Sequence, residues 1–177
     1  YLSTIQTLQT SKQAPVLDLA CGHGRNGLYL VENDINVCFA DVNGESLEQV
    51  EQSLHLTSID KQKLAECWEI DFEQANTDPL FHKSFTAVMV FRYLHRPLFD
   101  QIKAAIKPGG MIIYETFTQQ QAQFGRPKNP DFLLKPSELA DLFEDWQILH
   151  SFEGVKNASQ NGDVKQAIAQ IVAVKPI

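Results

Sequence analysis

The sequence predicts a doubly wound α/β fold, in which helices cover both faces of a mostly parallel sheet. Short apolar runs rich in β-branched residues recur along the chain, and stretches with helical spacing lie between them. A glycine-rich loop, Gly22–Gly27, joins the first apolar run to the first helical stretch. Alternation of this kind is typical of parallel strands joined by crossover helices.

The apolar runs and the stretches between them give the order of the elements. Each run is too short for a helix and is bounded by Gly, Pro, Asn or Asp. Four buried strands are expected at Val16–Ala20, Val37–Ala40, Thr86–Phe91 and Met111–Phe117. Helices are expected where apolar residues have helical spacing, in Leu28–Val31, Leu47–Leu54 and Leu98–Ile106. A weaker, alternating run predicts a further strand at the edge of the sheet, Ala65–Ile70.

The last third of the chain begins with a polar stretch at residues 118–135, which is long for a connection. Residues 136–143 are expected to form a short helix, because Pro and Ser open it. Two further strands are predicted at Gln147–Phe152 and Ala167–Val174. The segment between them has no room for a crossover helix and contains Gly and Asn turn formers, so these strands should be antiparallel.

Length and composition predict a single domain over residues 1–177. No apolar run approaches the ~20 residues that span a bilayer, which argues against membrane insertion. A net charge of −7 repels a phosphate backbone, so nucleic acid is a poor candidate and a small-molecule substrate is expected. The composition leaves a monomer and a dimer equally open.

The cysteines and the chain start bear on the cellular setting. Cys21, Cys38 and Cys67 are odd in number and lack C-x-x-C spacing, so neither a disulfide framework nor a metal site is expected. A reducing cytoplasm fits this pattern best. The chain begins at Tyr1 without a basic region followed by an apolar one, so we expect no signal peptide and a missing N-terminal segment.

Glycines at positions 22, 24 and 27 satisfy G-x-G-x-x-G between a strand and a helix, a pattern that favours nucleotide binding. A dinucleotide would place its pyrophosphate against this loop. Asp18, four residues before Gly22, would repel that pyrophosphate but attract the ammonium and sulfonium charges of S-adenosylmethionine. The alternative for Asp18 is a solvated or helix-capping acid near a turn.

Two further acids follow the next strands. Asp41 closes the second strand, where a carboxylate can accept both hydroxyls of a ribose from either class of nucleotide. Asp71 and Phe72 end the weaker third strand, where the acid could bind an adenine amino group and the ring could pack on the base. An edge-strand turn with a core Phe is the equal alternative for this pair.

Together these motifs resemble a class I S-adenosylmethionine-dependent methyltransferase: D-L-A-C-G-H-G at Asp18–Gly24, Asp41, Asp71-Phe72 and K-P-G-G at Lys107–Gly110. Three further segments resemble small bacterial methyltransferases of the tellurite-resistance and thiopurine type: Gly24–Leu30, Arg92–Phe99 and Gly125–Leu134. The resemblance implies a Rossmann-like methyltransferase fold whose seven-stranded sheet has its last strand inserted antiparallel. It also implies a cofactor set of Asp18, Ala20, the Cys21 backbone, Gly22, Gly24, Asp41, Val42, Asp71, Phe72 and Phe91.

The acceptor should lie beyond the ends of the fourth and fifth strands, because ligands bind at the carboxyl ends of parallel strands. The catalytic candidates there are His95 as a base or anion contact, Arg92 with Arg96 as contacts to an acidic substrate, and Tyr114 or Glu115 as orienting groups. Each has an alternative in capping, packing or local pairing. Methyl transfer to sulfur, selenium or tellurium needs mainly alignment, so a catalytic base is optional. Residues 118–135, with Arg126, are either a lid or a surface loop.

Three functions stay open at this point. The first is methyl transfer from S-adenosylmethionine to a small acceptor that is anionic or contains a thiol or chalcogen. The second is a nicotinamide-dependent oxidoreductase, which G-x-G-x-x-G and Asp41 favour and Asp18 opposes. The third is a non-catalytic module that binds S-adenosylmethionine, because a fold and a cofactor site do not establish turnover.

Overall fold

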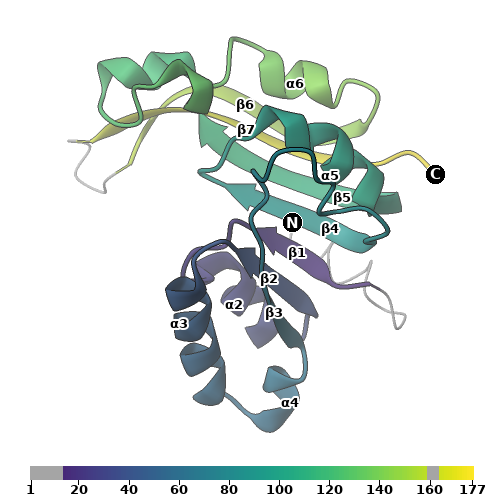
Figure 1. The fold of residues 1–177 in the computed structure, drawn as a ribbon. Helices are drawn as coiled ribbons and strands as arrows, with labels where there is room; N and C mark the ends of the chain where they lie inside the picture. Colours follow the sequence, from purple (N-terminus) through teal and green to yellow (C-terminus); the bar gives the residue numbers. More distant parts are fainter. Residues whose placement is uncertain (1–13, 159–163) are drawn as a thin grey trace.

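A computed structural model describes residues 14–158 and 164–177, and seven strands within them form one sheet (Figure 1). Their spatial order is β3-β2-β1-β4-β5-β7-β6. The strands are β1 (Val16–Leu19), β2 (Val37–Asp41), β3 (Ala65–Glu69), β4 (Phe85–Phe91), β5 (Ile106–Phe117), β6 (Gln147–Asn157) and β7 (Lys165–Val174). The doubly wound fold class is therefore confirmed, including the prediction of seven strands.

Strand directions also agree with the sequence. β1 pairs in parallel with β2 and β4, β2 with β3, and β4 with β5, whereas β7 runs antiparallel between β5 and β6. The weaker strand β3 lies at one edge, as its alternating pattern predicts. Part of the turn predicted between β6 and β7, at 159–163, lies outside the described residues.

Helices cover both faces of the sheet because successive apolar side chains of a strand point to opposite faces of the sheet. In β1, Val16 packs toward α2 (Arg25–Glu32) and α3 (Gly44–His55), while Leu17 packs toward α5 (Phe99–Ala105) and α6 (Glu138–Leu142). Figure 1 shows α2 and α3 beside β1–β3, and α5 and α6 over the opposite side. The central strands β1, β2 and β4 are thus buried between two helical layers, as their mostly apolar sequences require.

Short single turns are the elements that the sequence pattern does not predict. They are α4 (Ile59–Gln62), η1 (Arg96–Leu98), η2 (Gln119–Gln123) and η3 (Pro130–Phe132). Each is five residues or fewer, which is too short to show a helical period. In the described part of the chain, no helix combines the length and apolar character needed to cross a bilayer.

Candidate functional site

The glycine loop leaves β1 and turns back over the end of β2. The Cys21 amide donates to the Ala40 carbonyl at 3.0 Å, and the Gly24 amide donates to the Cys21 carbonyl at 3.0 Å. Gly22 has φ +52°, and a Cβ atom built on it would meet nothing within 4 Å. The loop therefore leaves open space above Gly22, where a ligand can approach the backbone closely.

The other two glycines have a structural reason. A Cβ atom at Gly24 would lie 2.7 Å from Val50 Cγ2, and one at Gly27 would lie 2.3 Å from Phe39 Cε1. Both would collide with the core that α2, α3 and β2 form. These glycines thus let the loop and the start of α2 pack tightly on the sheet.

Asp18 lies underneath this loop. Its carboxylate is 3% exposed and accepts a hydrogen bond from the Gly27 amide at 2.9 Å. Burial raises the pKa of Asp18 from 3.8 to about 7; the nearby Asp41 charge adds to the rise and the Gly27 amide opposes it. Asp18 therefore supports the loop from below, and its predicted attraction for a cationic ligand would act through the loop.

Asp41 ties the loop to the end of β2. One carboxylate oxygen accepts from the Gly22 amide at 2.7 Å and the other accepts from the Asn43 amide at 2.9 Å. Each carboxylate oxygen can accept about two hydrogen bonds. Asp41 therefore positions the loop and keeps acceptor capacity for a ligand.

A cavity of about 480 Å³ opens beside the loop, and we call it the first cavity. It is lined by Ala20, Asp41, Val42, Ile70, Asp71, Phe72, Glu73 and Tyr93. Three carboxylates and no basic side chain stand in this wall. Val42 adds apolar surface to this wall, because it is 62% exposed.

The first cavity brings together five of the residues predicted as a cofactor set and adds three. Ala20, Asp41, Val42, Asp71 and Phe72 line it, whereas Asp18, Cys21, Gly22, Gly24 and Phe91 do not. Phe91 packs instead against the core beneath α2. Ile70, Glu73 and Tyr93 were not predicted in this set, although Tyr93 lies in the Phe91–Arg96 segment where the acceptor was expected. Ile70 and Glu73 flank Asp71-Phe72 in sequence, which is the only signal that points to them.

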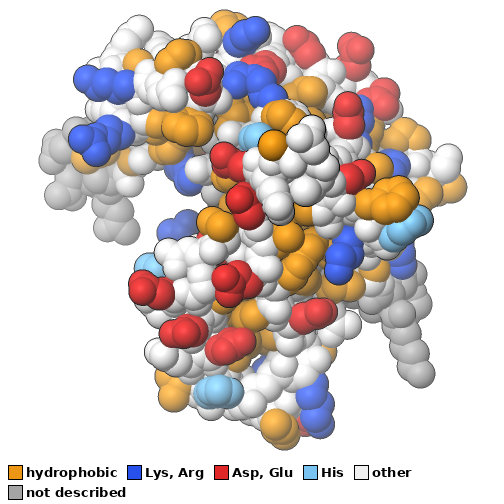
Figure 2. Space-filling model, viewed as in Figure 1, with side chains coloured by type: hydrophobic (Ala, Val, Ile, Leu, Met, Phe, Trp, Pro, Cys, Tyr) orange, Lys and Arg blue, Asp and Glu red, His pale blue; other side chains and the backbone are white. Residues whose placement is uncertain are grey.

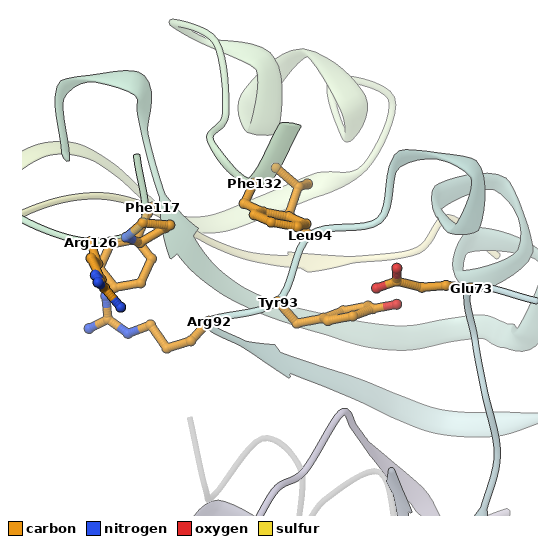
Figure 3. Close-up of a pocket in the computed structure, with 8 residues that line it drawn as sticks. Glu73, Arg92, Tyr93, Leu94, Phe117, Arg126 and Phe132 are labelled. Atoms are coloured by element: carbon orange, nitrogen blue, oxygen red, sulfur yellow. The ribbon is translucent and has the colours of Figure 1, made fainter. Parts of the chain in front are cut away.

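A second cavity, of about 450 Å³, adjoins the first (Figure 3). It is lined by Glu73, Arg92, Tyr93, Leu94, Phe117, Arg126, Pro127 and Phe132. Figure 3 shows the side chains of Arg92 and Arg126 close together beside Phe117, and Glu73 at the opposite end beyond Tyr93. The second cavity is therefore basic at one end, acidic at the other and aromatic between them.

The two arginines differ in their charge balance. Arg92 pairs with Glu115 at 3.0 Å, donates to Gln166 at 2.9 Å and lies 4.5 Å from the centre of the Phe117 ring. Arg126 has no ion pair within residues 14–158 and 164–177. Arg126 is consequently the cation of this cavity whose charge is available to a bound anion.

Tyr93 is aimed into the cavities by its backbone. The preceding Arg92 has φ +61°, an uncommon conformation for a non-glycine residue, and its amide donates to the Glu115 carbonyl at 2.8 Å. The Tyr114 hydroxyl donates to the Tyr93 carbonyl at 2.9 Å. These bonds hold the chain in the sharp turn that follows β4.

Tyr114 and His95, two of the catalytic candidates, lie outside the walls of both cavities. Tyr114 is 2% exposed, burial raises the pKa of its phenol above the usual range, and its hydroxyl is used in the bond to the Tyr93 backbone. It positions Tyr93 and does not line either cavity. His95 precedes η1 and also lies outside the walls of both cavities. Of the five candidates Arg92, His95, Arg96, Tyr114 and Glu115, Arg92 alone lines one of the two cavities.

The Tyr93 hydroxyl is a buried polar atom without a hydrogen-bond partner among the described residues. Burial raises the pKa of Tyr93 above its usual range, and the charge of Glu73 raises it further. The phenol thus stays protonated at neutral pH. A buried hydroxyl on a cavity wall is available to a ligand atom.

Arg96 holds the segment over the second cavity and is not one of the residues that line it. It pairs with Glu138 at 2.6 Å and donates to the carbonyls of Asp131 and Leu133, each at 2.9 Å. The Glu138 bond raises the pKa of Arg96, and the same pairing lowers the pKa of Glu138. Sequence reasoning could not find this role, because the partners lie 35 residues or more away.

Gln121 fixes the other part of that segment. Its side chain is 3% exposed, accepts from the Ala167 amide at 2.8 Å and donates to the Arg126 carbonyl at 3.1 Å.

Figure 2 shows basic side chains gathered at the upper left, over the segment between β5 and α6, and acidic ones lower down, over α3. The site lies between surfaces of opposite charge.

Comparison with known proteins identifies the family. The model of the family described as tellurite resistance protein TehB matches residues 2–170. The chain belongs to the TehB family. No curated protein sequence matches it.

Solved structures agree with the fold of this TehB-family chain. TehB from Haemophilus influenzae aligns at a TM-score of 0.74 and 22% identity over 99% of the chain and 62% of that protein. The N-methyltransferase NodS from Bradyrhizobium japonicum aligns at 0.66 and 14% identity, over 99% and 94%. The glycopeptide N-methyltransferase MtfA, solved with S-adenosylmethionine, aligns at 0.63 and 16%, over 99% and 92%. The chain therefore has the class I methyltransferase fold and spans 62% of the length of the Haemophilus protein.

Proposed function

We propose that this chain is an S-adenosylmethionine-dependent methyltransferase that acts on a small molecule. The observation that carries the proposal is the charge of the first cavity, whose wall has three carboxylates and no basic side chain. Such a wall attracts the ammonium and sulfonium groups of S-adenosylmethionine and repels the pyrophosphate of a nicotinamide dinucleotide. Membership of the TehB family and the methyltransferase fold support the same choice.

The residues present fit this cofactor. The open space above Gly22 admits a ligand against the loop backbone, and Asp41 keeps acceptor capacity for ribose hydroxyls. Val42 and Phe72 offer apolar surface, and Asp71 an acceptor, to an adenine. When bound, the cofactor supplies a methyl group already activated on a sulfonium.

The second cavity is the proposed acceptor site. Its basic end, at Arg92 and Arg126, favours a small anionic, thiol or chalcogen acceptor although the chain as a whole carries −7. Long-range repulsion is screened over ~8 Å at physiological salt, whereas arginine in direct contact forms charge-assisted bonds. The chain's task is to align the acceptor and exclude water, so a general base is not required.

The setting is proposed from the same features. The three cysteines are free thiols, which fits a reducing cytoplasm. We propose that residues 1–177 act as one domain, because each cavity is lined by residues from both sides of the central strand β1.

Calorimetric titration tests the cofactor. We expect S-adenosylmethionine and S-adenosylhomocysteine to bind and NAD not to bind. Asp41→Ala should weaken both complexes by about 1–3 kcal/mol, because ribose hydroxyls lose a charged acceptor in a partly desolvated cleft. Tight NAD binding without a response to S-adenosylhomocysteine would refute the proposal, and an unchanged affinity in folded Asp41→Ala would remove Asp41 from the site.

An acceptor screen tests the reaction. S-adenosylhomocysteine release is measured with small anionic, thiol and chalcogen-oxyanion compounds and with a neutral aromatic set. Arg92→Ala should lower turnover of anions, and so should Arg126→Gln, which leaves no carboxylate newly unpaired among the described residues. Lys128→Gln removes the same charge outside the cavity and serves as the control. Activity confined to neutral acceptors would contradict the anionic assignment, and binding without any turnover would favour a non-catalytic module.

A further inference from the structure

Two residues line both cavities, Glu73 and Tyr93. If the cofactor occupies the first cavity and the acceptor the second, the methyl group has to cross where the cavities meet. Figure 3 shows the Tyr93 side chain extended toward the Glu73 carboxylate, so the two polar groups approach each other at that junction. A charged group at the junction would lie close to the sulfonium of a bound methyl donor.

The acids of the first cavity are not equivalent. Both oxygens of Asp41 accept hydrogen bonds from backbone amides. Asp71 accepts a hydrogen bond from the Glu73 amide at 2.8 Å, and it lines the first cavity but not the second. Asp18 lies outside this cavity, buried beneath the loop. Within the described chain, no ion pair and no backbone amide engages the Glu73 carboxylate, and its polar neighbour is the neutral phenol of Tyr93. Glu73 is thus the carboxylate of this wall whose charge neither a cation nor a backbone amide balances.

We propose that Glu73 recognises the sulfonium charge and makes the chain bind S-adenosylmethionine more tightly than S-adenosylhomocysteine. This inference rests on the proposed function. In the transfer, a lone pair of the acceptor forms the new bond to the methyl carbon while the carbon–sulfur bond pair passes to sulfur. The sulfonium charge is lost in this step: it neutralises an anionic acceptor or passes to a neutral one, and the sulfur of the spent cofactor is left uncharged. The attraction between Glu73 and that sulfur therefore disappears, and product release is favoured.

Binding experiments test this without an acceptor. The dissociation constants of S-adenosylmethionine and S-adenosylhomocysteine are measured by calorimetry for the wild type and three variants. Glu73→Gln should weaken S-adenosylmethionine about fivefold, the scale of one partly solvated charge pair, and leave S-adenosylhomocysteine within about twofold. Asp71→Asn should weaken both ligands by the same factor, because its neighbours in the first cavity are shared by both.

The control and the outcomes separate the two proposals. Glu48→Gln removes an exposed carboxylate on α3 outside both cavities and should change neither constant. Equal weakening of both ligands by Glu73→Gln, or no weakening of either, would overturn the role of Glu73 while leaving the proposed function intact. Failure of the wild type to bind either ligand would instead refute the proposed function. Thermal unfolding of each variant confirms that it is folded.

Discussion

Asp18→Asn should stabilise the protein at alkaline pH, although it removes a residue of the glycine motif. Asp18 is buried, and its carboxylate receives one hydrogen bond, from the Gly27 amide at 2.9 Å. An asparagine oxygen can accept the same bond and carries no charge into the core. The substitution therefore keeps the geometry and removes a desolvated charge.

The magnitude follows from the pKa of Asp18, which burial raises from 3.8 to about 7. Between about pH 4 and pH 7 the Asp18 carboxyl stays protonated in the folded wild type, whereas in the unfolded chain it has already lost its proton. Wild-type stability therefore falls as pH rises from about 4 to about 7 and is constant above that range. At about 1.4 kcal/mol per pH unit, Asp18→Asn should gain up to about 4 kcal/mol above pH 7, and none below pH 4.

Urea denaturation at several pH values tests this linkage. Between pH 5.5 and 8 the difference in unfolding free energy between Asp18→Asn and wild type should widen by about 2 kcal/mol. Asp78→Asn, at an exposed position, is the matched control and should give a constant difference. Parallel stability curves for Asp18→Asn and wild type would show that Asp18 ionises as an ordinary surface acid and that the burial argument is wrong.

Other substitutions separate folding from binding. Gly22→Ala should cost about 1 kcal/mol of stability but lower S-adenosylhomocysteine affinity at least tenfold, because its Cβ enters the open space of the loop; Gly27→Ala should cost about 3 kcal/mol or more, because its Cβ meets the core at 2.3 Å. Arg96→Ala should cost about 1–3 kcal/mol and raise hydrogen exchange at residues 131–134. Tyr114→Phe should cost about 1 kcal/mol and leave cofactor affinity unchanged, which urea denaturation and calorimetry would measure.

The fold follows from the sequence because its signals are local. The runs that become β1, β2 and β4 are mostly apolar and almost wholly buried, as strands covered on both faces require, and β3 alternates because it lies at an edge. The antiparallel pair at the end follows from the length of its connection. Single turns such as α4 and η1 were missed because they carry no period.

The site was predicted less completely because its remaining features depend on packing between distant segments. The sequence places Asp18 beside the glycine loop, but its burial and its hydrogen bond to the Gly27 amide depend on how the loop folds. Tyr114 ends a strand pattern in the right place, yet its hydroxyl is used by the Tyr93 backbone. Glu73 carries no motif and becomes notable only because it borders both cavities.

The acidic wall of the first cavity and the basic end of the second follow from strand order. Asp41 ends β2 and Asp71 follows β3, whereas Arg92 follows β4 and Arg126 lies beyond β5. In the sheet, β3 and β2 stand on one side of β1, and β4 and β5 on the other. The carboxyl edge of the sheet therefore runs from acidic to basic across the glycine loop. A cationic methyl donor would be attracted to the acidic side, near β2 and β3, and an anionic acceptor to the basic side, near β4 and β5. The order of the strands thus favours the arrangement that the proposed methyl transfer needs.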